Sequence, residues 1–547
     1  MSTAWPSTPW TDLYPPGTTA VTGPLRHASL ADYAAAACAR FADQTAVVQD
    51  DVVLTYRELD RLSQAFSTWL QRDARLAAGE RLAIMMPNLP QYLVTLLGAW
   101  RAGLVVVNVN PQYTARELAY QLRDAGAAAV VVLEAALPLL NEARAELPPT
   151  VAARVIVTTM AELGPGTPAA TPQRDGEVSF GSTLQAAELL PDVPRGTDDL
   201  ALLQYTGGTT GVSKGAMLAH GNLLANLQQG DAWYGPFITP GRESVLTVLP
   251  LYHIFGLMFN GLQMLGYGAC NRLIASPRDV SAIAAALRAG CTVISGVNTL
   301  YTAMLEAPAF AGIDFKGLKL SVSGGASAQP SVVTRWQQRT GDRIVEGYGL
   351  TETSPFALSN PLHTRYGSGL VPLPSTEVEI RDDEGAALPP GQAGEICIRG
   401  PQVMRGYWQR PAETAAVLSA DGWLRTGDIG VMDAQGRFTV TDRKKDMVLV
   451  SGFNVFPNEV EAVLDQHPGV VESAVVGVPD ERTGEAVLAC VVRRDPAVTA
   501  DMLEAHCRAA LTAYKVPRQY QFVDQLPKSP VGKILRRELR TQMKKSD

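Results

Sequence analysis

The sequence predicts an α/β protein, with a large N-terminal domain of helix-covered parallel sheets followed by a smaller α+β domain. Short apolar runs alternate with amphipathic helical patterns over most of the chain, which is typical of such sheets. The 547 residues exceed one ordinary hydrophobic core, so two or more domains are expected. A charged stretch at residues 441–452, "TDRKKDMVLVSG", separates this alternation from a compact tail with its own pattern.

Two strand–helix–strand units support the prediction of parallel sheets. The first spans residues 81–111. The second spans residues 318–349, and its helix starts at Pro330 and ends at Gly341. Ligands of open α/β sheets collect beyond the carboxyl ends of strands. The segments "SGGA" and "EGYGLTE", which end the two strands of the second unit, are therefore candidate site segments.

The tail predicts a domain of its own. After the charged stretch, the pattern reads helix, strand, strand and helix over residues 457–514. A unit of this length lies within ordinary domain sizes. We therefore expect an N-terminal domain at residues 1–441, a hinge at 442–446 and a C-terminal domain at 447–547.

Composition and charge exclude several classes of protein. The net charge of −7 argues against general nucleic-acid binding, which needs a sizeable basic surface. The six cysteines are scattered without metal-ligand spacing, so we interpret them as reduced thiols of a cytoplasmic protein. No secretory signal is visible at the N-terminus, which agrees with a cytoplasmic location.

An uncharged segment at residues 244–271 is long enough to span a bilayer. Pro250, His253, Asn260, Gln263 and several glycines interrupt it. These residues favour a buried strand-and-helix region beside an apolar ligand site over a membrane span. Taken alone, His253 is more typical of a core histidine with a satisfied ring than of a catalytic base.

The segment "YTGGTTGVSKG" at residues 205–215 has the composition of a phosphate-binding loop. Its glycines let backbone N–H groups converge on oxyanions, and its hydroxyl groups and lysine add donors. It departs from the Walker A pattern, because Ser213 stands where that pattern has glycine and Gly215 where it has serine or threonine. Apolar runs on both sides indicate two strands. The segment is therefore either a triphosphate loop or a glycine-rich hairpin turn.

Charged and hydroxyl residues elsewhere fit a nucleotide site in combination. Thr351 and Glu352 end "EGYGLTE", where a hydroxyl can bind phosphate and a carboxylate can bind Mg²⁺. Asp428 in "RTGD" is the residue type that binds ribose hydroxyls, and Arg443 supplies a fixed cation. Lys533 follows a Pro/Gly turn, from which its ammonium can reach across an interdomain cleft. Each residue taken alone is more typical of an exposed surface charge.

Together these motifs resemble the adenylate-forming superfamily of acyl-CoA synthetases, luciferases and peptide-synthetase adenylation domains. The motifs occur in that superfamily's order and spacing: "YTGGTTGVSKG", "LPLYHIFG", "EGYGLTE", "DGWLRTGDIGVMD", "DRKKDMVLVSGFNVFPNEVE" and "PKSPVGKILRREL". The resemblance covers nearly the whole chain. It looks closest to bacterial long-chain fatty acyl-CoA synthetases, whose signature is similar to residues 421–447.

This resemblance implies an N-terminal domain of two helix-sandwiched sheets plus a small β-barrel, and a mobile C-terminal domain that rotates between half-reactions. In the first half-reaction, a long-chain fatty carboxylate attacks the α-phosphate of Mg·ATP, which leaves acyl-AMP and pyrophosphate. In the second, the thiol of CoA displaces AMP. The expected partners are fatty acid, ATP and CoA, with Mg²⁺ as the cofactor.

The resemblance also implies a role for each matching residue. The residues expected at the triphosphate are Thr206, Gly207, Gly208, Thr209, Thr210 and Lys214, with Thr206 and Glu352 as Mg²⁺ contacts. The residues expected around adenine are Gly325, Ala326, Glu346, Gly347, Tyr348 and Gly349. The residues expected at the α-phosphate and ribose are Thr351, Asp428, Val440 and Arg443.

The remaining roles implied by the resemblance concern catalysis and domain motion. Lys533 stabilises negative charge on the carboxylate and the α-phosphate during adenylation. His253 lies beside the acyl carboxylate and shapes the pocket rather than acting as a base. Lys445 matches the hinge position, and Gly452 matches the backbone that lines the pantetheine channel.

The chain departs from the family pattern at a few positions, and alternatives remain open. Gly207 and Ser213 stand where serine and proline are frequent, and Leu370 stands where glycine is common, which affects the local shape of the pocket. A medium-chain or aryl CoA ligase is one alternative. A fatty acyl-AMP ligase is another, although the insertion that such proteins carry near the hinge is not visible. A non-catalytic sensor with a decayed site is the third, and the joint presence of Lys533 and Glu352 argues against it.

The basic C-terminal end suggests a surface role as well. Its cations are Lys533, Arg536, Arg537, Arg540, Lys544 and Lys545. They raise the hypothesis of peripheral contact with the inner face of the cell membrane, with a solvated helix face as the alternative. Related synthetases are often dimers, so a homodimer is a further hypothesis.

Overall fold

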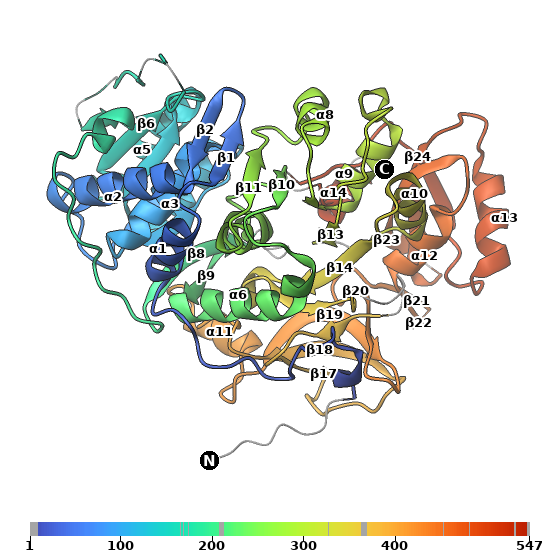
Figure 1. The fold of residues 1–547 in the computed structure, drawn as a ribbon. Coiled ribbons are helices and arrows are strands. Elements are labelled where there is room, and N and C mark those ends of the chain that lie inside the picture. The colour runs from blue at the N-terminus through green and yellow to red at the C-terminus, as the bar shows by residue number, and fades with distance from the viewer. Residues whose placement is uncertain are drawn as a thin grey trace.

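The computed structural model describes residues 9–543, apart from 165, 168, 173, 175, 207–212, 326–327, 363–368, 452, 481 and 530–531. Its strands form sheets of nine, seven, five and four strands. Figure 1 shows the seven-stranded sheet at one end of the molecule, the C-terminal domain at the other and the four-stranded sheet below them. The predicted α/β class is therefore confirmed.

The nine-stranded sheet is parallel in its middle and antiparallel at both edges. In order across the sheet, its strands are β16 (Val371–Pro372), β15 (Phe356–Ser359), β14 (Ile344–Gly349), β13 (Leu320–Gly324), β12 (Val293–Gly296), β10 (Ser244–Thr247), β11 (Cys270–Leu273), β1 (Thr45–Gln49) and β2 (Val52–Thr55). Its outer face is covered by α8 (Val280–Arg288), α9 (Asn298–Glu306) and α10 (Pro330–Thr340). The predicted unit at 318–349 corresponds to β13, α10 and β14.

The seven-stranded sheet is parallel except for its last pair, β8 and β9. Its order is β7 (Glu177–Ser179), β6 (Arg154–Thr158), β5 (Ala127–Leu133), β3 (Arg81–Met85), β4 (Val105–Asn108), β8 (Leu200–Thr206) and β9 (Lys214–Ala219). The antiparallel β8 and β9 flank the glycine-rich loop, as the apolar runs predicted.

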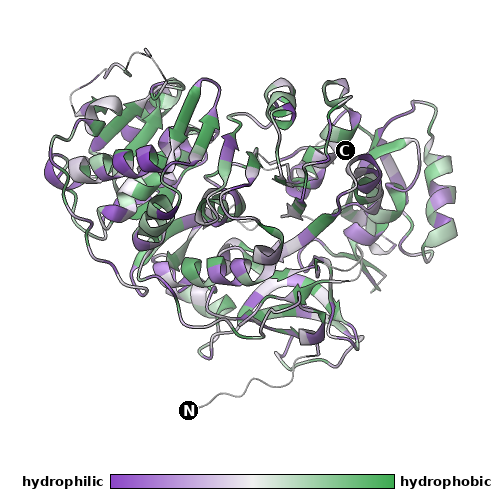
Figure 2. Cartoon of the chain, in the orientation of Figure 1, coloured by the Kyte–Doolittle hydropathy of each residue, from purple (hydrophilic) through white to green (hydrophobic). Residues whose placement is uncertain are grey.

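Helices separate the two large sheets. The helices α1 (Leu30–Arg40), α2 (Tyr56–Arg72), α3 (Pro90–Arg101) and α6 (His220–Tyr234) share one core with strands of both sheets, while α4 (Ala115–Ala125) and α5 (Leu137–Arg144) cover the other face of the seven-stranded sheet. All residues of α3 are buried, because it lies between two apolar layers. In Figure 2 the strands beside α2 are mostly green, whereas α2 itself carries many purple residues.

The four-stranded sheet lies where the resemblance implies a small barrel. Its antiparallel strands are β17 (Glu377–Arg381), β18 (Ala393–Arg399), β19 (Leu424–Met432) and β20 (Phe438–Arg443), with α11 (Pro411–Val417) between β18 and β19. The pairing of the described strands runs from β17 to β20 without closing. A bridge between Leu370 and Phe438 connects β20 to the chain just before β16.

The C-terminal domain has its own sheet and its own buried clusters. Its strands are β22 (Phe453–Val455), β21 (Val448–Val450), β24 (Gly484–Arg493), β23 (Val470–Asp480) and β25 (Gln519–Phe522), and its helices are α12 (Pro457–Leu464), α13 (Ala500–Ala510) and α14 (Arg536–Met543). The predicted order of helix, strand, strand and helix after the charged stretch is confirmed by α12, β23, β24 and α13.

The uncharged segment 244–271 is part of the core. It forms β10, a π-helix η5 (Gly256–Gln263), α7 (Met264–Gly266) and the start of β11, and all residues of η5 are buried. Among the described residues, no helix is long and apolar enough to cross a membrane. The interpretation of this segment as a buried strand-and-helix region is therefore confirmed. All six cysteines are free thiols.

Candidate active site

A cavity of about 240 Å³ lies where the nine-stranded sheet, the four-stranded sheet and the C-terminal domain meet. From the N-terminal side it is lined by Gly325, Glu346, Gly347, Tyr348, Gly349, Leu370, Asp428, Val440 and Arg443, among others. From the C-terminal domain it is lined by Asn458, Glu461, Asp465, Lys533 and Arg536, among others. The cavity thus brings together most of the residues predicted for adenine and ribose with the predicted catalytic lysine.

Parallel strands place the adenine-side residues. Residues Ser323 and Gly324 of β13 lie beside Glu346 and Gly347 of β14, so both strands end at the same edge of the sheet. Gly325 follows with φ +79°, a left-handed conformation that glycine adopts without strain.

Glu346 is a half-buried carboxyl at this edge. Burial raises its pKa to about 7, although the N–H of Ala328 donates to its Oε1 at 3.2 Å and lowers it. A group with this pKa exists in both protonation states near neutral pH, so it can accept or donate a hydrogen bond. Both options suit an adenine edge, which carries acceptors as well as an amino donor.

The residues expected at the ribose lie on a hairpin of the four-stranded sheet. Asp428 of β19 and Arg443 of β20 are directly paired, and the Arg443 Nε lies 3.5 Å from the Asp428 Oδ1. The Tyr348 hydroxyl donates to the Asp428 Oδ2 at 2.7 Å. Asp428 is 6% exposed, and its carboxylate has one partner from each of the two sheets. This geometry fixes an acceptor that can bind sugar hydroxyls.

Lys533 enters the cavity from the C-terminal domain. The preceding Gly532 has φ +80°, and a Cβ there would lie 2.4 Å from the Thr299 Oγ1, so the turn packs closely against the start of α9. Burial and the nearby charges of Arg443, Lys445 and Arg536 lower the pKa of Lys533 to about 7, against the opposing effect of Asp428. Close packing therefore holds the ammonium among the nucleotide-side groups.

His253 lies close enough to Lys533 for their charges to interact. Burial, followed by the Lys533 charge, lowers the pKa of His253 to about 4. The N–H of Phe255 donates to the His253 Nδ1 at 3.3 Å. The ring is therefore neutral at pH 7 and a weak base, which agrees with the expected role in shaping the pocket.

A second group of residues surrounds the ends of β8 and β9. Thr206 and Lys214 are paired across the two strands, and the Ser213 hydroxyl donates to the Thr206 carbonyl at 2.5 Å. Thr351 and Glu352 lie in a 3-10 turn, η7 (Thr351–Thr353), that packs against both strands. The predicted residues Gly207, Gly208, Thr209 and Thr210 lie outside the described residues, as do Ala326 and Gly452.

Tyr407 joins this second group and was missed by the sequence analysis. Its hydroxyl donates to the Glu352 Oε1 at 2.7 Å, and the Lys214 Nζ lies 5.1 Å from the centroid of its ring. The segment around Tyr407 runs beside β9, through a bridge to Ala216. Nothing in "RGYWQ" marks the tyrosine as functional, because its partners come from distant parts of the sequence.

We expect Tyr407→Phe to lower kcat/KM for ATP about tenfold, because hydrogen bonds to charged groups contribute about 1.5–3 kcal/mol. The phenyl ring of the variant still supports Lys214, so Tyr407→Leu should lower kcat/KM further. Steady-state kinetics with ATP as the varied substrate measure both values. A Phe variant with wild-type kcat/KM would show that the hydroxyl does not hold Glu352 in a productive position.

Lys445 lies near the nucleotide side as well as at the expected hinge. Burial, then the Arg443 charge, lowers its pKa to about 8, while Asp446 and Asp428 oppose this shift. It follows β20 in a turn in which the N–H of Asp446 donates to the carbonyl of Arg443. Because Lys445 lies near Asp428 and also at the turn between the domains, its charge can respond both to Asp428 and to the position of the C-terminal domain.

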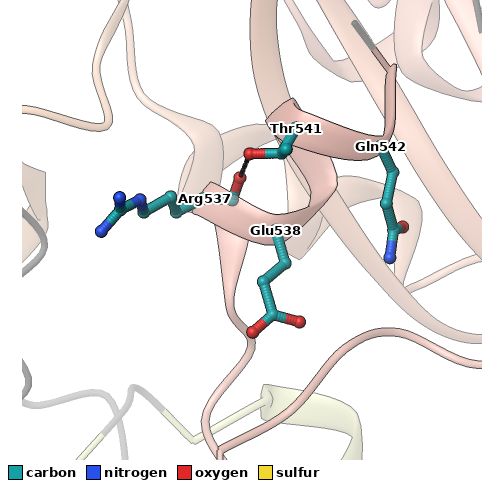
Figure 3. A pocket seen from close by; sticks show the side chains of 4 residues that line it. All are labelled: Arg537, Glu538, Thr541 and Gln542. Carbon is teal, nitrogen blue, oxygen red and sulfur yellow. Dashed lines mark hydrogen bonds between the residues drawn. The ribbon is translucent and has the colours of Figure 1, made fainter. Parts of the chain in front are cut away.

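The basic C-terminal end does not form one outward face. Lys533 points into the cavity, the Arg536 side chain is only 15% exposed, and Arg540 pairs with Asp446 at 3.2 Å. A shallow hollow on the outer side of α14 is lined by Arg537, Glu538, Thr541 and Gln542 (Figure 3). These side chains spread apart rather than converge, and Lys544 and Lys545 lie outside the described residues. The run of cations that suggested membrane contact is thus divided between interior and surface.

Comparisons with known proteins agree with this site. A family model described as AMP-binding enzyme matches residues 34–408, and one described as AMP-binding enzyme C-terminal domain matches residues 459–533. The long-chain-fatty-acid–CoA ligase of Escherichia coli O6:H1 is 47% identical, over 97% of this chain and 98% of that protein. The structure of the anthranilate CoA ligase AuaEII in complex with anthranoyl-AMP has a TM-score of 0.87 at 26% identity, over 96% of this chain and 98% of that one.

Two structures of a second relative are similar to this chain to different extents. ATP-bound MatB from Rhodopseudomonas palustris has a TM-score of 0.83 at 32% identity, over 94% of this chain and 99% of that one. The apo structure of the same protein, at the same identity and coverage, has a TM-score of 0.74. The chain belongs to the AMP-binding enzyme family, the adenylate-forming superfamily that its motifs resemble.

Proposed function

We propose that this protein is an AMP-forming long-chain-fatty-acid–CoA ligase, which activates a fatty acid with ATP and transfers the acyl group to CoA. The names of its full-length relatives support the substrate class. The observation that carries the proposed chemistry is the position of Lys533, in one cavity with Asp428, Arg443 and Tyr348 and close to His253.

Adenylation requires a carboxylate to approach a negatively charged α-phosphate. A buried ammonium between them offsets the repulsion of the two anions and stabilises charge that develops as the bond forms. Lys533 is proposed for this role, with the Thr351 hydroxyl at the same phosphate. Asp428 and Arg443 orient the ribose, and the edge of β13 and β14 receives adenine. The product is acyl-AMP, and pyrophosphate leaves.

The second group of residues is proposed to hold the leaving pyrophosphate. Lys214, supported by the Tyr407 ring, lies at the base of the glycine-rich loop, and Thr206 lies opposite. Glu352 and Thr206 supply hard oxygen ligands, and a carboxylate keeps acceptor sites after accepting one bond from Tyr407. No group of three or more His, Cys, Asp or Glu side chains able to hold a metal ion occurs among the described residues. This donor set fits Mg²⁺, which takes few protein ligands and completes its shell with phosphates and water.

When bound, Mg²⁺ supplies charge neutralisation of the phosphate oxygens. The acyl chain is proposed to lie along the uncharged segment 244–271, whose π-helix η5 follows His253 closely and is apolar over most of its length. π-helical turns are frequent at functional sites, because the wider turn moves side chains out of regular register. An apolar lining there suits an alkyl chain.

Thioester formation is proposed to use the same site after the C-terminal domain turns about residues 442–446. The domain limits 1–441 and 447–547 follow from that hinge. Lys445 is proposed as the hinge residue, and Gly452 as part of the passage for the thiol arm of CoA. The thiol displaces AMP from acyl-AMP, for which Lys533 is not required.

The test is ATP–pyrophosphate exchange with carboxylic acids of increasing chain length and with aryl acids, followed by thioester formation with CoA. We expect the highest kcat/KM with long-chain acids, and thioester formation with the same acids. Exchange without thioester would favour an acyl-AMP ligase, and a maximum at medium-chain or aryl acids would favour those ligases. If no acid supports exchange, the proposed function is wrong.

A further inference from the structure

We propose that Arg536 is a positioning residue, which keeps the Lys533 ammonium in the cavity by fixing the start of α14 to α12 and to the turn after β20. This inference deepens the proposed function and rests on it. Arg536 lies outside the roles assigned above, and the sequence presents it only as part of a basic run.

The Arg536 guanidinium has partners in the expected hinge and in the C-terminal domain. Its Nη2 donates to the Glu461 Oε2 at 2.7 Å, to the Glu461 Oε1 at 2.8 Å and to the Asn458 Oδ1 at 2.5 Å, and its Nε donates to the Glu461 Oε1 at 3.2 Å. Its Nη1 lies 4.0 Å from the Asp442 Oδ1 and 3.8 Å from the Asp446 Oδ2. The planar fork of arginine is needed to reach these oxygens together.

The acceptors around Arg536 are themselves buried. The Asp442 side chain is 0% exposed, and those of Asp446 and Glu461 are 12% exposed. Asp442 also accepts from the N–H of Asn458 at 2.8 Å, which ties the end of β20 to the first turn of α12. Removing the arginine would leave several carboxylates buried without their shared cation, which favours a different arrangement of the segments that carry them.

The chain connects this cluster tightly to Lys533. The Lys533 N–H donates to the Ser529 hydroxyl at 3.1 Å, and the Ser529 N–H donates to the Lys533 carbonyl at 2.8 Å. A bridge pairs Lys528 with Ile534, and the N–H of Leu535 donates to the Pro527 carbonyl at 2.8 Å. These contacts connect residues 527–529 to residues 533–535, which continue directly into α14. The position of Lys533 in the cavity depends on where α14 begins, and Arg536 is the first residue of α14.

Arg536 also contributes to the charge around Lys533. The charges that shift the pKa of Lys533 are those of Asp428 in β19, Arg443 in β20, Lys445 after β20 and Arg536 in α14, and the Lys533 charge in turn lowers the pKa of His253 before η5. The same cavity is also lined by the titratable residues Glu346, Tyr348, Asp442, Glu461, Asp465 and Glu472. The charges of Arg443, Lys445 and Arg536 disfavour the protonated form of Lys533, whereas the charge of Asp428 favours it. Loss of the Arg536 charge should therefore raise the pKa of Lys533, which a purely structural arginine elsewhere would not do.

The experiment compares Arg536→Gln and Arg536→Lys in the full-length enzyme by ATP–pyrophosphate exchange with a long-chain acid. We expect Arg536→Gln to lower kcat about 100-fold with a much smaller change in KM for ATP, because displacement of a catalytic group by about 1 Å has effects of this size. Arg536→Lys keeps the charge but loses the fork, and should lower kcat about tenfold. The lysine variant keeps the test valid if the glutamine variant does not fold.

The control is Arg508→Gln, which removes an exposed arginine that pairs with Glu504 on α13 of the same domain. Exposed pairs within a helix contribute little, so this variant should keep its exchange rate. In the pH profile of exchange, the alkaline limb should move to higher pH in Arg536→Gln and stay in place in Arg536→Lys.

Unchanged exchange in both Arg536 variants would overturn the proposal. So would a loss matched by Arg508→Gln, or a loss in Arg536→Gln with an unshifted alkaline limb, since each indicates a general effect on the domain. Absence of exchange in the wild-type enzyme would instead reject the proposed function. The two failures are therefore distinguishable.

Discussion

Lys533→Ala should lower the rate of acyl-AMP formation by about 10²–10³-fold, as expected when a buried donor to a developing negative charge is removed. The ammonium lies in the cavity at the domain boundary with Asp428 and Arg443 nearby, so a solvent cation is not expected to replace it in the same geometry. Thioester formation started from supplied acyl-AMP should fall by less than about tenfold, because that step needs no cation between two anions. Exchange and single-turnover thioester assays measure the two rates separately.

A matched control for Lys533→Ala comes from the same turn. Lys528 pairs with Glu472 at 2.8 Å, and its side chain is 30% exposed. Lys528→Ala should keep exchange within about fivefold, since partly exposed ion pairs contribute about 1 kcal/mol or less. Equal losses in both half-reactions of Lys533→Ala would refute the assigned role, and so would equal losses of exchange in the two lysine variants.

The pH dependence of the wild-type enzyme follows from the same lysine. Its pKa is about 7, so the fraction of enzyme with a protonated Lys533 falls as the pH rises through 7. In the pH profile of kcat/KM for ATP, which reports the free enzyme, the decrease on the alkaline side should therefore begin near neutral pH. In the pH profile of kcat this decrease should lie at higher pH, because the negative charge of the bound triphosphate favours the protonated form of Lys533. An alkaline limb at the same pH in both parameters would contradict this assignment.

The helices and strands that could be predicted from the sequence are those whose signals come from neighbouring residues. Pro330 and Gly341 mark the two ends of α10, and the alternating apolar runs locate β13 and β14, because these patterns depend on neighbouring residues. The resemblance then predicted which residues beyond those strands lie together. Of these, Gly325, Glu346 and Tyr348 line one cavity with Lys533.

Sequence reasoning missed residues whose roles depend on distant partners. Tyr407 contacts Glu352 and Lys214 only because the chain after β18 returns to run beside β9. Arg536 looks like its exposed neighbour Arg537 in sequence, yet it is buried among carboxylates of β20 and α12. Nothing local distinguishes a buried arginine from a solvated one, because the difference is made by partners that are distant in the sequence. The described part of the basic C-terminal run is divided between interior and surface for the same reason, and the hypothesis of membrane contact stays a prediction.

Asp428→Asn should lower kcat/KM for ATP by about 100-fold, since truncating one partner of a buried charged network costs several kcal/mol. The carboxylate accepts from Tyr348 and faces Arg443, and an asparagine cannot accept from both while also binding ribose hydroxyls. The comparison is Asp433→Asn in the exposed turn of the same hairpin, where the aspartate pairs with Arg437 at 2.7 Å. That variant should keep its kcat/KM.

The pH profile of Asp428→Asn should move in the direction opposite to that of Arg536→Gln. Asp428 is the facing group that favours the protonated form of Lys533, so its neutralisation lowers the pKa of the lysine further below 7. The alkaline limb of kcat/KM should then move to lower pH, whereas loss of the Arg536 cation moves it to higher pH. Shifts in the same direction in both variants would show that the limb does not report Lys533. Opposite shifts would identify one ammonium whose protonation is set jointly by the hairpin of Asp428 and Arg443 and by the start of α14.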